Sequence, residues 1–447
     1  MNASGCWEWS APLACGFSLN SFPTCMSGTC GIGCNTGFRS CDTMNSTGCE
    51  TEVQSNIMHC GACNNACNGT GGTPSCTNGS CGIACFTNRG DCNVDAGDGC
   101  EASLLTDGRH CGACGRDCLG GACSAGKCQP LVLATGVNPK RIAVDSQFVY
   151  WTNEGTQAAG FSDGSVYKVS KLGGTPVALA TNQPRPIGIT VDATHVFFTT
   201  QGPSGTYNGS VKRVPTGGGT VVTLASAQPM PWAVAIDPLG RLWWACRGTY
   251  NTSSQPYSYN NDGSVRRSAK DGSGQVVVAA NQAEPVAIAF PGWVGSGDAE
   301  AVWALRGGYM SSLGGIGYHR TSGTNQTIVS GQPFPESVAA DTNYAYYPVQ
   351  GGGVRRALLY NPASQPPLVI RDTLGGNSAE GMLVDATHVY WTETGSGQLR
   401  RAPIAGGTTE NLHNIGNNYT VPLGLASDGT AMYWVAEYSG SILKLAK

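Results

Sequence analysis

The chain has 447 residues, a formal net charge of −3 and only 12% charged residues, together with 64 glycines. A nearly neutral chain has no basic field that favours nucleic acid or an anionic membrane, and no apolar run approaches the roughly 20 residues of a membrane-spanning helix. Abundant glycine with many short runs of Val, Thr, Tyr and Trp is typical of an all-β chain with many turns.

The cysteines gather in the first part of the chain. Of 21 cysteines, 20 lie before residue 129, in a segment with few large apolar side chains. Such a density indicates a disulfide framework formed in an oxidising compartment, and hence a secreted or cell-surface protein. The first residues, MNASGCWEWS, lack both the basic and the apolar segment of a secretory leader. We therefore expect that the sequence starts after processing or is a piece of a longer protein.

The disulfide-rich region, residues 1–128, contains two copies of one unit. Seven consecutive cysteines beginning at Cys30 have spacings of 4, 7, 8, 11, 3 and 4, and the seven beginning at Cys81 repeat them with an offset of 51. One earlier cysteine extends each copy to eight, so that the units cover about 25–67 and 76–118. Phrases such as HCGAC and GCE recur at matching places, which indicates an internal duplication. The predicted framework consists of Cys25, Cys30, Cys34, Cys41, Cys49, Cys60, Cys63, Cys67, Cys76, Cys81, Cys85, Cys92, Cys100, Cys111, Cys114, Cys118, Cys123 and Cys128.

Eight cysteines allow four bridges in each unit, and the flanking Cys6, Cys15, Cys123 and Cys128 allow two more. The pair Cys123-x4-Cys128 repeats the start of each unit, so we expect an array that is capped at its back and cut at its front. Each bridge contributes roughly 2–4 kcal/mol by restricting the unfolded chain, which replaces a large apolar core. The pairing stays open, because eight cysteines allow many connectivities.

Two metal sites compete with the disulfide interpretation. The CxxC motifs at 60–63 and 111–114 each follow a histidine and have the spacing of zinc ligands, but the even number of cysteines around them favours disulfides. Calcium is the second candidate, because oxygen-bearing side chains alternate in DCNVDAGDGCE as a hard cation prefers. The first copy, SCDTMNSTGCE, lacks most of those oxygens, so a polar turn is the competing interpretation. The calcium hypothesis uses Asp91, Asn93, Asp95, Asp98 and Glu101.

From residue 129 onward an anchor phrase recurs seven times, at intervals of about 43–54 residues. It consists of Pro, an alternating apolar run, Asp, a short turn, and a strand rich in Tyr and Trp. A third strand such as GSVYKVS and a fourth such as TPVALAT follow. Four short antiparallel strands per repeat indicate the blades of a β-propeller. The anchor aspartates are Asp145, Asp192, Asp237, Asp341, Asp385 and Asp428.

The seventh repeat stops after its third strand, SILKLAK, where the sequence ends. Its fourth strand is expected at the front, in PLVLATG (130–136), which matches TPVALAT. Pairing of this strand with the last one would close the ring and cover sheet edges that otherwise invite aggregation. The sequence therefore predicts an all-β protein: a seven-bladed β-propeller over 129–447, preceded by a small disulfide-rich repeat region with little regular secondary structure.

Several phrases resemble known families. PRPIGITVD, GSVYKVSKLGG, VYWTN (149–153) and VYWTE (389–393) resemble the YWTD and NHL classes of β-propeller, over about 130–447. The resemblance implies the fold more than a function, because such propellers include receptors, scaffolds and a few enzymes. YWTD propellers usually have six blades, so seven is a departure. HCGACGRDC and DGCE resemble the cysteine-rich repeats of myxobacterial and related secreted proteins, which carry no established chemistry.

Polar residues that recur in every blade are interpreted as structural. The anchor Asp should cap the turn after the inner strand through its carboxylate. His195 and His388 both lie in DATHV and belong to the same turn chemistry. A basic residue on each third strand should pair with acids or with backbone carbonyls. These basic residues are Lys168, Arg213, Arg267, His319, Arg356, Arg401 and Lys444.

Function is expected where the repeats differ, in the loops after the aromatic strands. The third loop, RGTYNTSSQPYSYNND, is long, and Tyr beside Arg is typical of a recognition surface, with an ordinary solvated loop as the alternative. A ring at the ends of the second strands should surround the channel mouth: Glu154, Gln201, Arg247, Arg306, Gln350, Thr394 and Glu437. The predicted binding residues are Glu154, Arg247, Tyr250, Tyr257, Tyr259, Arg306, Tyr309, Glu393 and Glu437.

Catalytic signals are weak. No Ser/His/Asp set, phosphate loop or HExxH motif appears, and Cys246 is expected to be a buried small hydrophobe although the adjacent Arg247 would lower a thiol pKa. The leading hypothesis is a non-catalytic binding or structural protein, active in adhesion or extracellular assembly, whose loop face contacts a protein, a glycan or a neighbouring subunit. The alternative is a propeller lyase or hydrolase at the channel mouth, which needs a convergent acid–base or metal set.

Overall fold

The computed structural model describes residues 19–26, 29–42, 44, 47–203, 206, 208–251, 258–292, 298–307, 314–351, 353–360, 362, 367–371, 378–414 and 422–447. The chain divides into two compact units, Met1–Gln129 and Pro130–Lys447. Almost all regular structure in these ranges is strand, which confirms the all-β prediction; η1 (Gln157–Ala159) is a short 3-10 helix. Within the described ranges no helix has the length and the apolar character that a membrane crossing requires.

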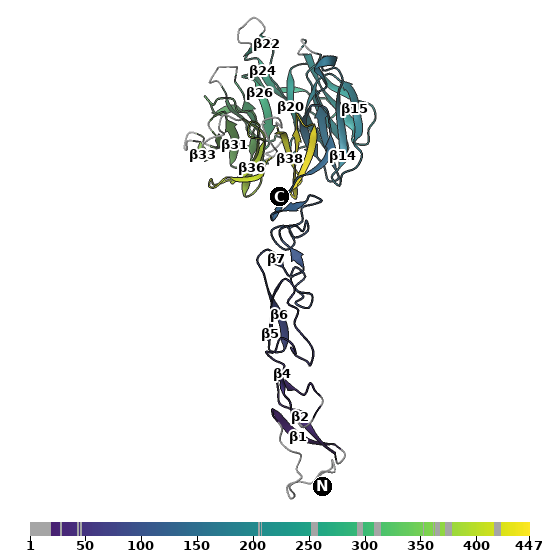
Figure 1. Cartoon of the computed structure of the whole chain (residues 1–447). Helices are drawn as coiled ribbons and strands as arrows, with labels where there is room; N and C mark the ends of the chain where they lie inside the picture. Colours follow the sequence, from purple (N-terminus) through teal and green to yellow (C-terminus); the bar gives the residue numbers. More distant parts are fainter. Residues whose placement is uncertain are drawn as a thin grey trace. The chain divides into compact units, whose positions relative to one another are not determined.

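The disulfide-rich unit is a succession of small antiparallel hairpins (Figure 1). Most strands are only two residues long, and the most deeply buried side chains include Cys49, Cys60, Cys100 and Cys111. Sulfur bridges therefore take the place of a large apolar core. The strands are β1 (Ser21–Met26), β2 (Thr29–Cys34), β3 (Phe38–Arg39), β4 (Thr51–Glu52), β5 (Gly72–Thr77), β6 (Ser80–Cys85), β7 (Arg89–Gly90), β8 (Ala102–Ser103), β9 (Cys123–Ser124) and β10 (Lys127–Cys128).

The bridges link each unit to the next, so the division into self-contained units of four bridges does not hold. In the first copy, two bridges stay inside the unit and two reach the following hairpin β5–β6. The second copy repeats this pattern and ends on the hairpin β9–β10. The pairs are Cys34–Cys49, Cys41–Cys63, Cys60–Cys76, Cys67–Cys81, Cys85–Cys100, Cys92–Cys114, Cys111–Cys123 and Cys118–Cys128.

Three consequences follow for the cysteine predictions. Both CxxC motifs consist of bridged cysteines, which excludes the zinc interpretation. Eight disulfides among the described residues indicate an oxidising compartment. Cys6, Cys15 and the side chains of Cys25 and Cys30 lie outside the described part of the chain.

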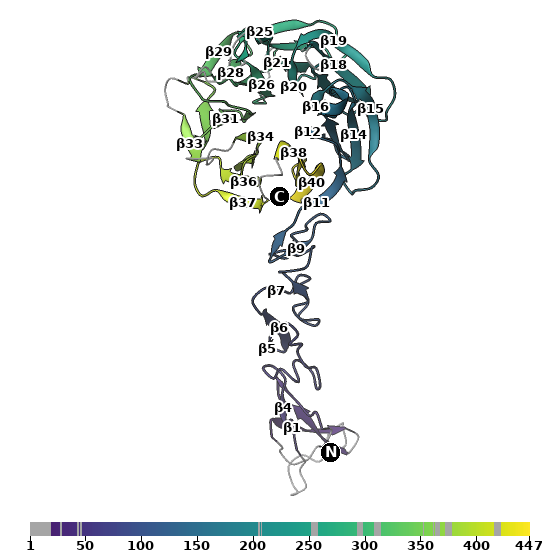
Figure 2. The same ribbon diagram turned by 45° about the horizontal axis from the view of Figure 1, so that its top comes forward.

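The second unit consists of seven four-stranded antiparallel sheets arranged in a ring (Figure 2), which confirms the predicted propeller. Residues of all seven blades line a cavity in a central channel. The second strand of each blade is buried along almost its whole length because both of its faces pack on neighbouring blades, whereas the fourth strands are half exposed. Blades 1 to 3 comprise β12 (Pro139–Val144), β13 (Phe148–Asn153), β14 (Gly164–Ser170) and β15 (Val177–Gln183); β16 (Pro186–Val191), β17 (His195–Thr200), β18 (Asn208–Pro215) and β19 (Val222–Pro229); and β20 (Pro231–Ile236), β21 (Leu242–Cys246), β24 (Gly263–Ser268) and β25 (Val276–Gln282).

The last blade takes its outer strand from the beginning of the propeller. β11 (Leu131–Thr135) pairs antiparallel with β40 (Ser441–Ala446), with Leu131 opposite Lys444 and Thr135 opposite Ser441. The remaining strands of blades 4 to 7 are β26 (Pro285–Ala289), β27 (Ala301–Leu305), β28 (Gly315–His319) and β29 (Asn325–Val329); β30 (Ala339–Ala340), β31 (Tyr344–Val349), β32 (Gly353–Leu358) and β33 (Leu368–Arg371); β34 (Ala379–Val384), β35 (His388–Glu393), β36 (Gln398–Pro403) and β37 (Glu410–Asn414); and β38 (Pro422–Ser427) and β39 (Ala431–Ala436).

The anchor aspartates cap turns, as predicted. Asp145 Oδ1 accepts the N–H groups of Gln147 and Phe148, both at 2.7 Å, and its Oδ2 accepts the Tyr150 hydroxyl at 2.6 Å. The same carboxylate–tyrosine bond recurs in blades 5, 6 and 7. Burial raises the pKa of Asp192, but the Lys270 ammonium and the turn amides outweigh it and lower that pKa to about 2. These carboxylates therefore hold the blades together in their ionised form.

Blade 4 lacks the anchor aspartate, and Asp298 supplies a carboxylate there that pairs with basic side chains of blades 3 and 4. The Asp298 carboxylate accepts hydrogen bonds from Arg241 at 2.8 Å, from His319 at 3.0 Å and from Arg267. The other third-strand basic residues also pair with acids or carbonyls as expected: Lys168 Nζ donates to the carbonyl of Thr216 in the next blade at 2.6 Å. The recurring polar residues are thus structural.

Candidate functional site at the channel mouth

The channel mouth is the end of the channel at which the inner strands begin and the second strands end. In most blades the first residue after the second strand donates its N–H to the residue just before the inner strand, as Arg306 does to the Glu284 carbonyl at 3.0 Å. The inner strands also shift register immediately after they begin, and such bulges redirect side chains. Each blade therefore presents up to three side chains at the mouth: one from the residue before the inner strand, one from the start of the inner strand, and one from the first residue after the second strand. The residue before the anchor proline has a left-handed φ at Asn138 (51°), Arg185 (56°), Met230 (52°), Glu284 (59°) and Phe334 (47°).

Blades 3 to 5 are joined at the mouth by a chain of charges. Glu284 is 1% exposed, and its Oε1 accepts hydrogen bonds from Arg247 Nε and from Arg306 Nη1, both at 3.0 Å. Arg306 Nε then donates to Glu336 Oε1 at 2.6 Å. The second oxygen of Glu284 is buried without a partner among the described residues. Both arginines are therefore fixed in position before any ligand arrives.

A second group of charges spans blades 7, 1 and 2. Lys140 pairs with Glu154 at 2.7 Å and also with Glu437, while Arg185 Nε donates to Glu154 at 2.7 Å. Glu154 is only 7% exposed, so its charge depends on these partners. Burial raises the pKa of Glu154, but the Lys140 and Arg185 charges overcome that effect and leave it below its usual range. The acids and bases of the mouth thus balance locally.

Blade 3 adds an aromatic cluster to this ring. The Arg247 guanidinium lies 4.4 Å from the Trp232 ring centroid and 4.2 Å from that of Tyr259, and it is 9% exposed. Tyr259 lies on a small extra hairpin, β22 (Tyr250–Asn251) paired with β23 (Ser258–Tyr259), and its ring meets Tyr250 edge-on at 5.2 Å. We name Trp232, Arg247, Tyr250 and Tyr259 the aromatic cluster.

Two carboxyl groups face the channel below the mouth. A cavity of about 170 Å³ is lined by residues of all seven blades, which lie on the inner strands or, in blade 5, just before the inner strand; they include Arg141, Glu336 and Glu380. Burial and the Glu380 charge raise the pKa of Glu336 to about 7, although Arg306 acts in the opposite direction. Arg141 reaches across from blade 1 and pairs with Glu380 at 3.2 Å. The channel therefore holds a carboxyl group that titrates near neutral pH.

The predicted binding residues fall into three groups. Glu154 and Glu437 belong to the charge group of blades 7, 1 and 2, Arg247 and Arg306 belong to that of blades 3 to 5, and Tyr250 and Tyr259 belong to the aromatic cluster. Glu393 does not join them: it is fully buried inside blade 6, where it accepts the Trp391 indole N–H at 3.0 Å. Tyr257 and Tyr309 lie outside the described residues.

Sequence reasoning missed the residues that come from the inner strands and the turns before them. They lie within two residues of the start of the anchor phrase, which is a proline in every blade but the sixth, and they differ from blade to blade, which is the signal that would have revealed them. These residues are Lys140, Arg141, Arg185, Trp232, Glu284, Glu336 and Glu380.

The two other sites considered from sequence are the polar loop that contains Asp91 and the thiol of Cys246. The carboxylates of Asp91, Asp98 and Glu101 lie within 4.8 Å of one another, but Glu101 accepts the Cys92 N–H at 3.0 Å. Glu50 makes the equivalent bond to Cys41 in the first copy, so this bond does not distinguish a polar turn from a calcium site, and calcium binding stays a prediction. Burial raises the pKa of the Cys246 thiol to about 12, which makes it unreactive.

Replacement of Glu336 by Gln should change how stability depends on pH. The folded-state pKa of Glu336 is about 7, above the usual 4.5, so the folded protein holds this proton more tightly. The wild type should therefore lose stability as pH rises from about 4.5 through 7, by at most roughly 3 kcal/mol. Glu336→Gln should remove that loss, measured by urea unfolding at pH 5 and pH 8. Glu437→Gln, a more exposed mouth carboxylate, is the control; an unchanged pH slope in Glu336→Gln would contradict the assignment.

Comparison with proteins of known structure supports the β-propeller fold. No protein-family model and no curated protein matches the chain. Virginiamycin B lyase from Staphylococcus aureus is similar over 71% of this chain and 98% of its own, with 16% identity and a TM-score of 0.53. A catalytically inactive histidine-to-alanine variant of that lyase with quinupristin gives 16% identity, the same coverage of 71% and 98%, and a TM-score of 0.50. YCF48 bound to D1 peptide is similar over 71% of this chain and 94% of its own, at 10% identity and a TM-score of 0.49. At an identity of 16%, the likeness to the two lyase structures shows the β-propeller fold alone.

Proposed function

We propose that this chain is an extracellular, non-catalytic binding protein whose propeller recognises a protein partner at the channel mouth. The observation that carries the proposal is the packing of Arg247 between Trp232 and Tyr259, at 4.4 and 4.2 Å. Trp, Tyr and Arg are the residue types in which the binding energy of protein interfaces concentrates. The Glu284 carboxylate already holds Arg247, so little side-chain entropy remains to be lost on binding.

The position of this cluster supports recognition. Within the described part of the propeller, only blade 3 carries a hairpin in the loop between its second and third strands. A feature that serves blade packing would recur in the other blades, as the anchor aspartates do. The charges of the mouth are balanced pairwise, which favours a partner surface of mixed character over a highly charged polymer. The oxidised cysteines support an extracellular partner.

Replacement of Tyr259 by Ala tests the proposal. The partner would be captured from the extracellular fraction on immobilised wild-type protein, purified, and titrated against each variant by calorimetry. Tyr259→Ala should weaken binding at least about tenfold, because it removes one face of the Arg247 stack. Leu239→Ala, an exposed side chain at the opposite end of blade 3, should bind like the wild type. Equal binding of Tyr259→Ala and wild type would rule out the aromatic cluster as the contact.

A second candidate function, an enzyme acting in the channel, is favoured by Glu336 alone. A carboxyl group with a pKa near 7 beside a second carboxyl can accept and return a proton. All six histidines lie in described ranges, and none lines the channel cavity, so catalysis would rest on carboxyl groups. Incubation with quinupristin, followed by chromatography, separates the two functions. We expect no conversion; conversion that disappears in Glu336→Gln but persists in Tyr259→Ala would place the enzyme first.

A further inference from the structure

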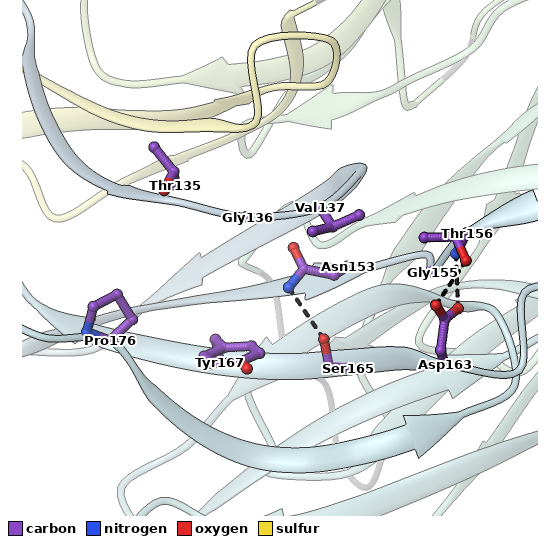
Figure 3. A pocket seen from close by; sticks show the side chains of 10 residues that line it. All are labelled: Thr135, Gly136, Val137, Asn153, Gly155, Thr156, Asp163, Ser165, Tyr167 and Pro176. Carbon is purple, nitrogen blue, oxygen red and sulfur yellow. Dashed lines mark hydrogen bonds between the residues drawn. The ribbon is translucent and has the colours of Figure 1, made fainter. Parts of the chain in front are cut away.

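A second cavity lies away from the channel, at the seam where the ring closes. It has a volume of about 400 Å³ and is bounded by the segment around Gly136 on one side and by blade 1 on the other (Figure 3). Asn153, Ser165 and Tyr167 form part of its blade 1 wall. We name it the seam pocket. Its volume falls within the range of roughly 300–1,000 Å³ that is usual for small-molecule sites.

The pocket exists because the closing segment breaks the repeat. At four other seams, the residue three positions before the anchor proline is a glutamine, and its side chain fills the space between the two blades. Gln228 Oε1 accepts the indole N–H of Trp244 at 2.9 Å, and Gln282 Oε1 accepts that of Trp303 at 3.0 Å. The closing segment has Gly136 at this position. The four glutamines are Gln183, Gln228, Gln282 and Gln332.

The surrounding residues are arranged so that this space stays open. The Trp151 indole N–H donates to Asn153 Oδ1 of its own blade at 3.1 Å, instead of to a glutamine from the neighbouring blade. A Cβ atom at position 136 would lie 2.4 Å from Asn153 Oδ1 and 2.9 Å from Trp151 Nε1, so a side chain is excluded there. The tryptophan is thus satisfied without a filler, and the pocket has no role in closing the blade.

The walls combine a flat aromatic ring with small uncharged polar groups. Tyr167 stacks on the fully buried Trp151, with ring centroids 5.7 Å apart and planes at 20°. At the matching position, blade 2 has Lys212, which bonds to Gln183, and blade 5 has Arg355, which bonds to Gln332. Tyr167 therefore departs from the repeat on the opposite wall from Gly136. Two independent departures at one seam indicate a site rather than a packing defect.

Several hydrogen-bonding groups remain available in the pocket. Ser165 Oγ accepts the Asn153 amide at 3.1 Å and keeps its own hydrogen to donate. The hydroxyls of Thr135 and Tyr167 have no partner among the described residues. Asp163 is held by Thr156 through two bonds of 2.7 Å, which leaves further lone pairs on its oxygens. No basic side chain lines the pocket within the described ranges.

We propose that the seam pocket binds a neutral sugar ring of a glycan. The apolar C–H face of a pyranose would lie on Tyr167, since the faces of aromatic rings are electron-rich and attract polarised C–H groups. The ring hydroxyls would bond to Ser165, Thr135 and Asp163. The absence of lining bases disfavours an anionic ligand. This site is separate from the aromatic cluster at the mouth, and the two can succeed or fail independently.

Saturation-transfer NMR with free sugars tests the proposal. The probes are millimolar glucose, galactose, mannose, fucose and N-acetylglucosamine, each added to the full chain. At least one should receive saturation from the wild type, and Tyr167→Ala should weaken its binding at least tenfold while Tyr167→Phe keeps it. Lys212→Ala, at the filled seam between blades 1 and 2, should bind like the wild type. No transfer to any sugar, or equal binding by Tyr167→Ala, would overturn the proposal, as would a short peptide that displaces the sugar and binds more tightly.

A double variant that refills the pocket with a side chain provides a second test. Gly136→Gln combined with Asn153→Ala supplies the missing glutamine and removes the nearer of the two atoms that crowd its Cβ, so that only a small shift of the Trp151 ring is needed to accommodate it. The new side chain should accept the Trp151 N–H as Gln228 does for Trp244, so the blade should stay folded. Sugar binding should be lost in the double variant, kept in Asn153→Ala alone, and partner binding at the mouth should be unchanged in both. A double variant that folds and still binds the sugar would exclude the seam pocket.

Discussion

A thiol reductant is expected to unfold residues 34–128 and to leave the propeller folded. All eight described bridges lie in the first unit, whereas the propeller's single cysteine, Cys246, is free and buried. Each bridge contributes roughly 2–4 kcal/mol, and few large apolar side chains remain to replace that contribution. The propeller instead buries tryptophans and tyrosines on the second strands of its blades, which reduction does not affect.

Hydrogen exchange followed by mass spectrometry on peptides from each unit measures both outcomes in one sample. With dithiothreitol, protection should vanish over 34–128 and persist over the blades. Alkylation serves as the control: the bridged cysteines should react at once, and Cys246 only after heating, because burial raises its pKa to about 12. Loss of protection in the blades at the same reductant concentration would show that the propeller depends on the bridges.

Deletion of residues 441–447 should abolish the cooperative unfolding of the propeller. This segment contains β40, which pairs with β39 on one side and with β11 on the other, so its loss removes the closure. Ile442 and Leu445 are 0% and 3% exposed. Loss of even one such side chain costs about 2–5 kcal/mol, and a typical domain has only about 5–15 kcal/mol in total.

Scanning calorimetry of the full chain measures this effect. Deletion of Lys447 alone is the matched control. It leaves β40 intact and removes one ion pair, in which Lys447 Nζ lies 3.0 Å from Asp385 Oδ2. Such a pair contributes at most about 1 kcal/mol, so the propeller transition should move by only a few degrees. A sharp, unshifted transition after the longer deletion would show that six blades hold the ring without the seventh.

Repetition decided what could be predicted from the sequence. The blades, their closure strand and the turn role of Asp145 follow from features that occur in nearly every repeat, so each copy supports the others. The charges of the mouth occur once each and pair across blades: Lys140 and Glu437 are 297 residues apart. No local pattern links such residues, and only the closed ring brings them together.

The errors have equally local causes. Glu393 lies two residues after Trp391 on one strand, so alternation turns its side chain into the blade with the tryptophan. Thr394, one residue later, reaches the mouth end of the blade and bonds to the Ser378 carbonyl. In the disulfide-rich unit, counting eight cysteines placed Cys76 with the cysteines that follow it. The structure pairs it with Cys60, because the first hairpin of each copy completes the unit before it.

The overlap of the bridged segments affects how the disulfide-rich unit responds to cleavage by a protease. From Cys34 to Cys81, and again from Cys85 to Cys128, every peptide bond lies inside at least one disulfide loop. A single proteolytic cut in either stretch would leave both fragments covalently joined. The exception is the short stretch between Cys81 and Cys85, which belongs to β6 and is hydrogen-bonded to β5. Between Cys34 and Cys128, the one place where a nick would sever the array is therefore held in a strand, where a protease has the least access.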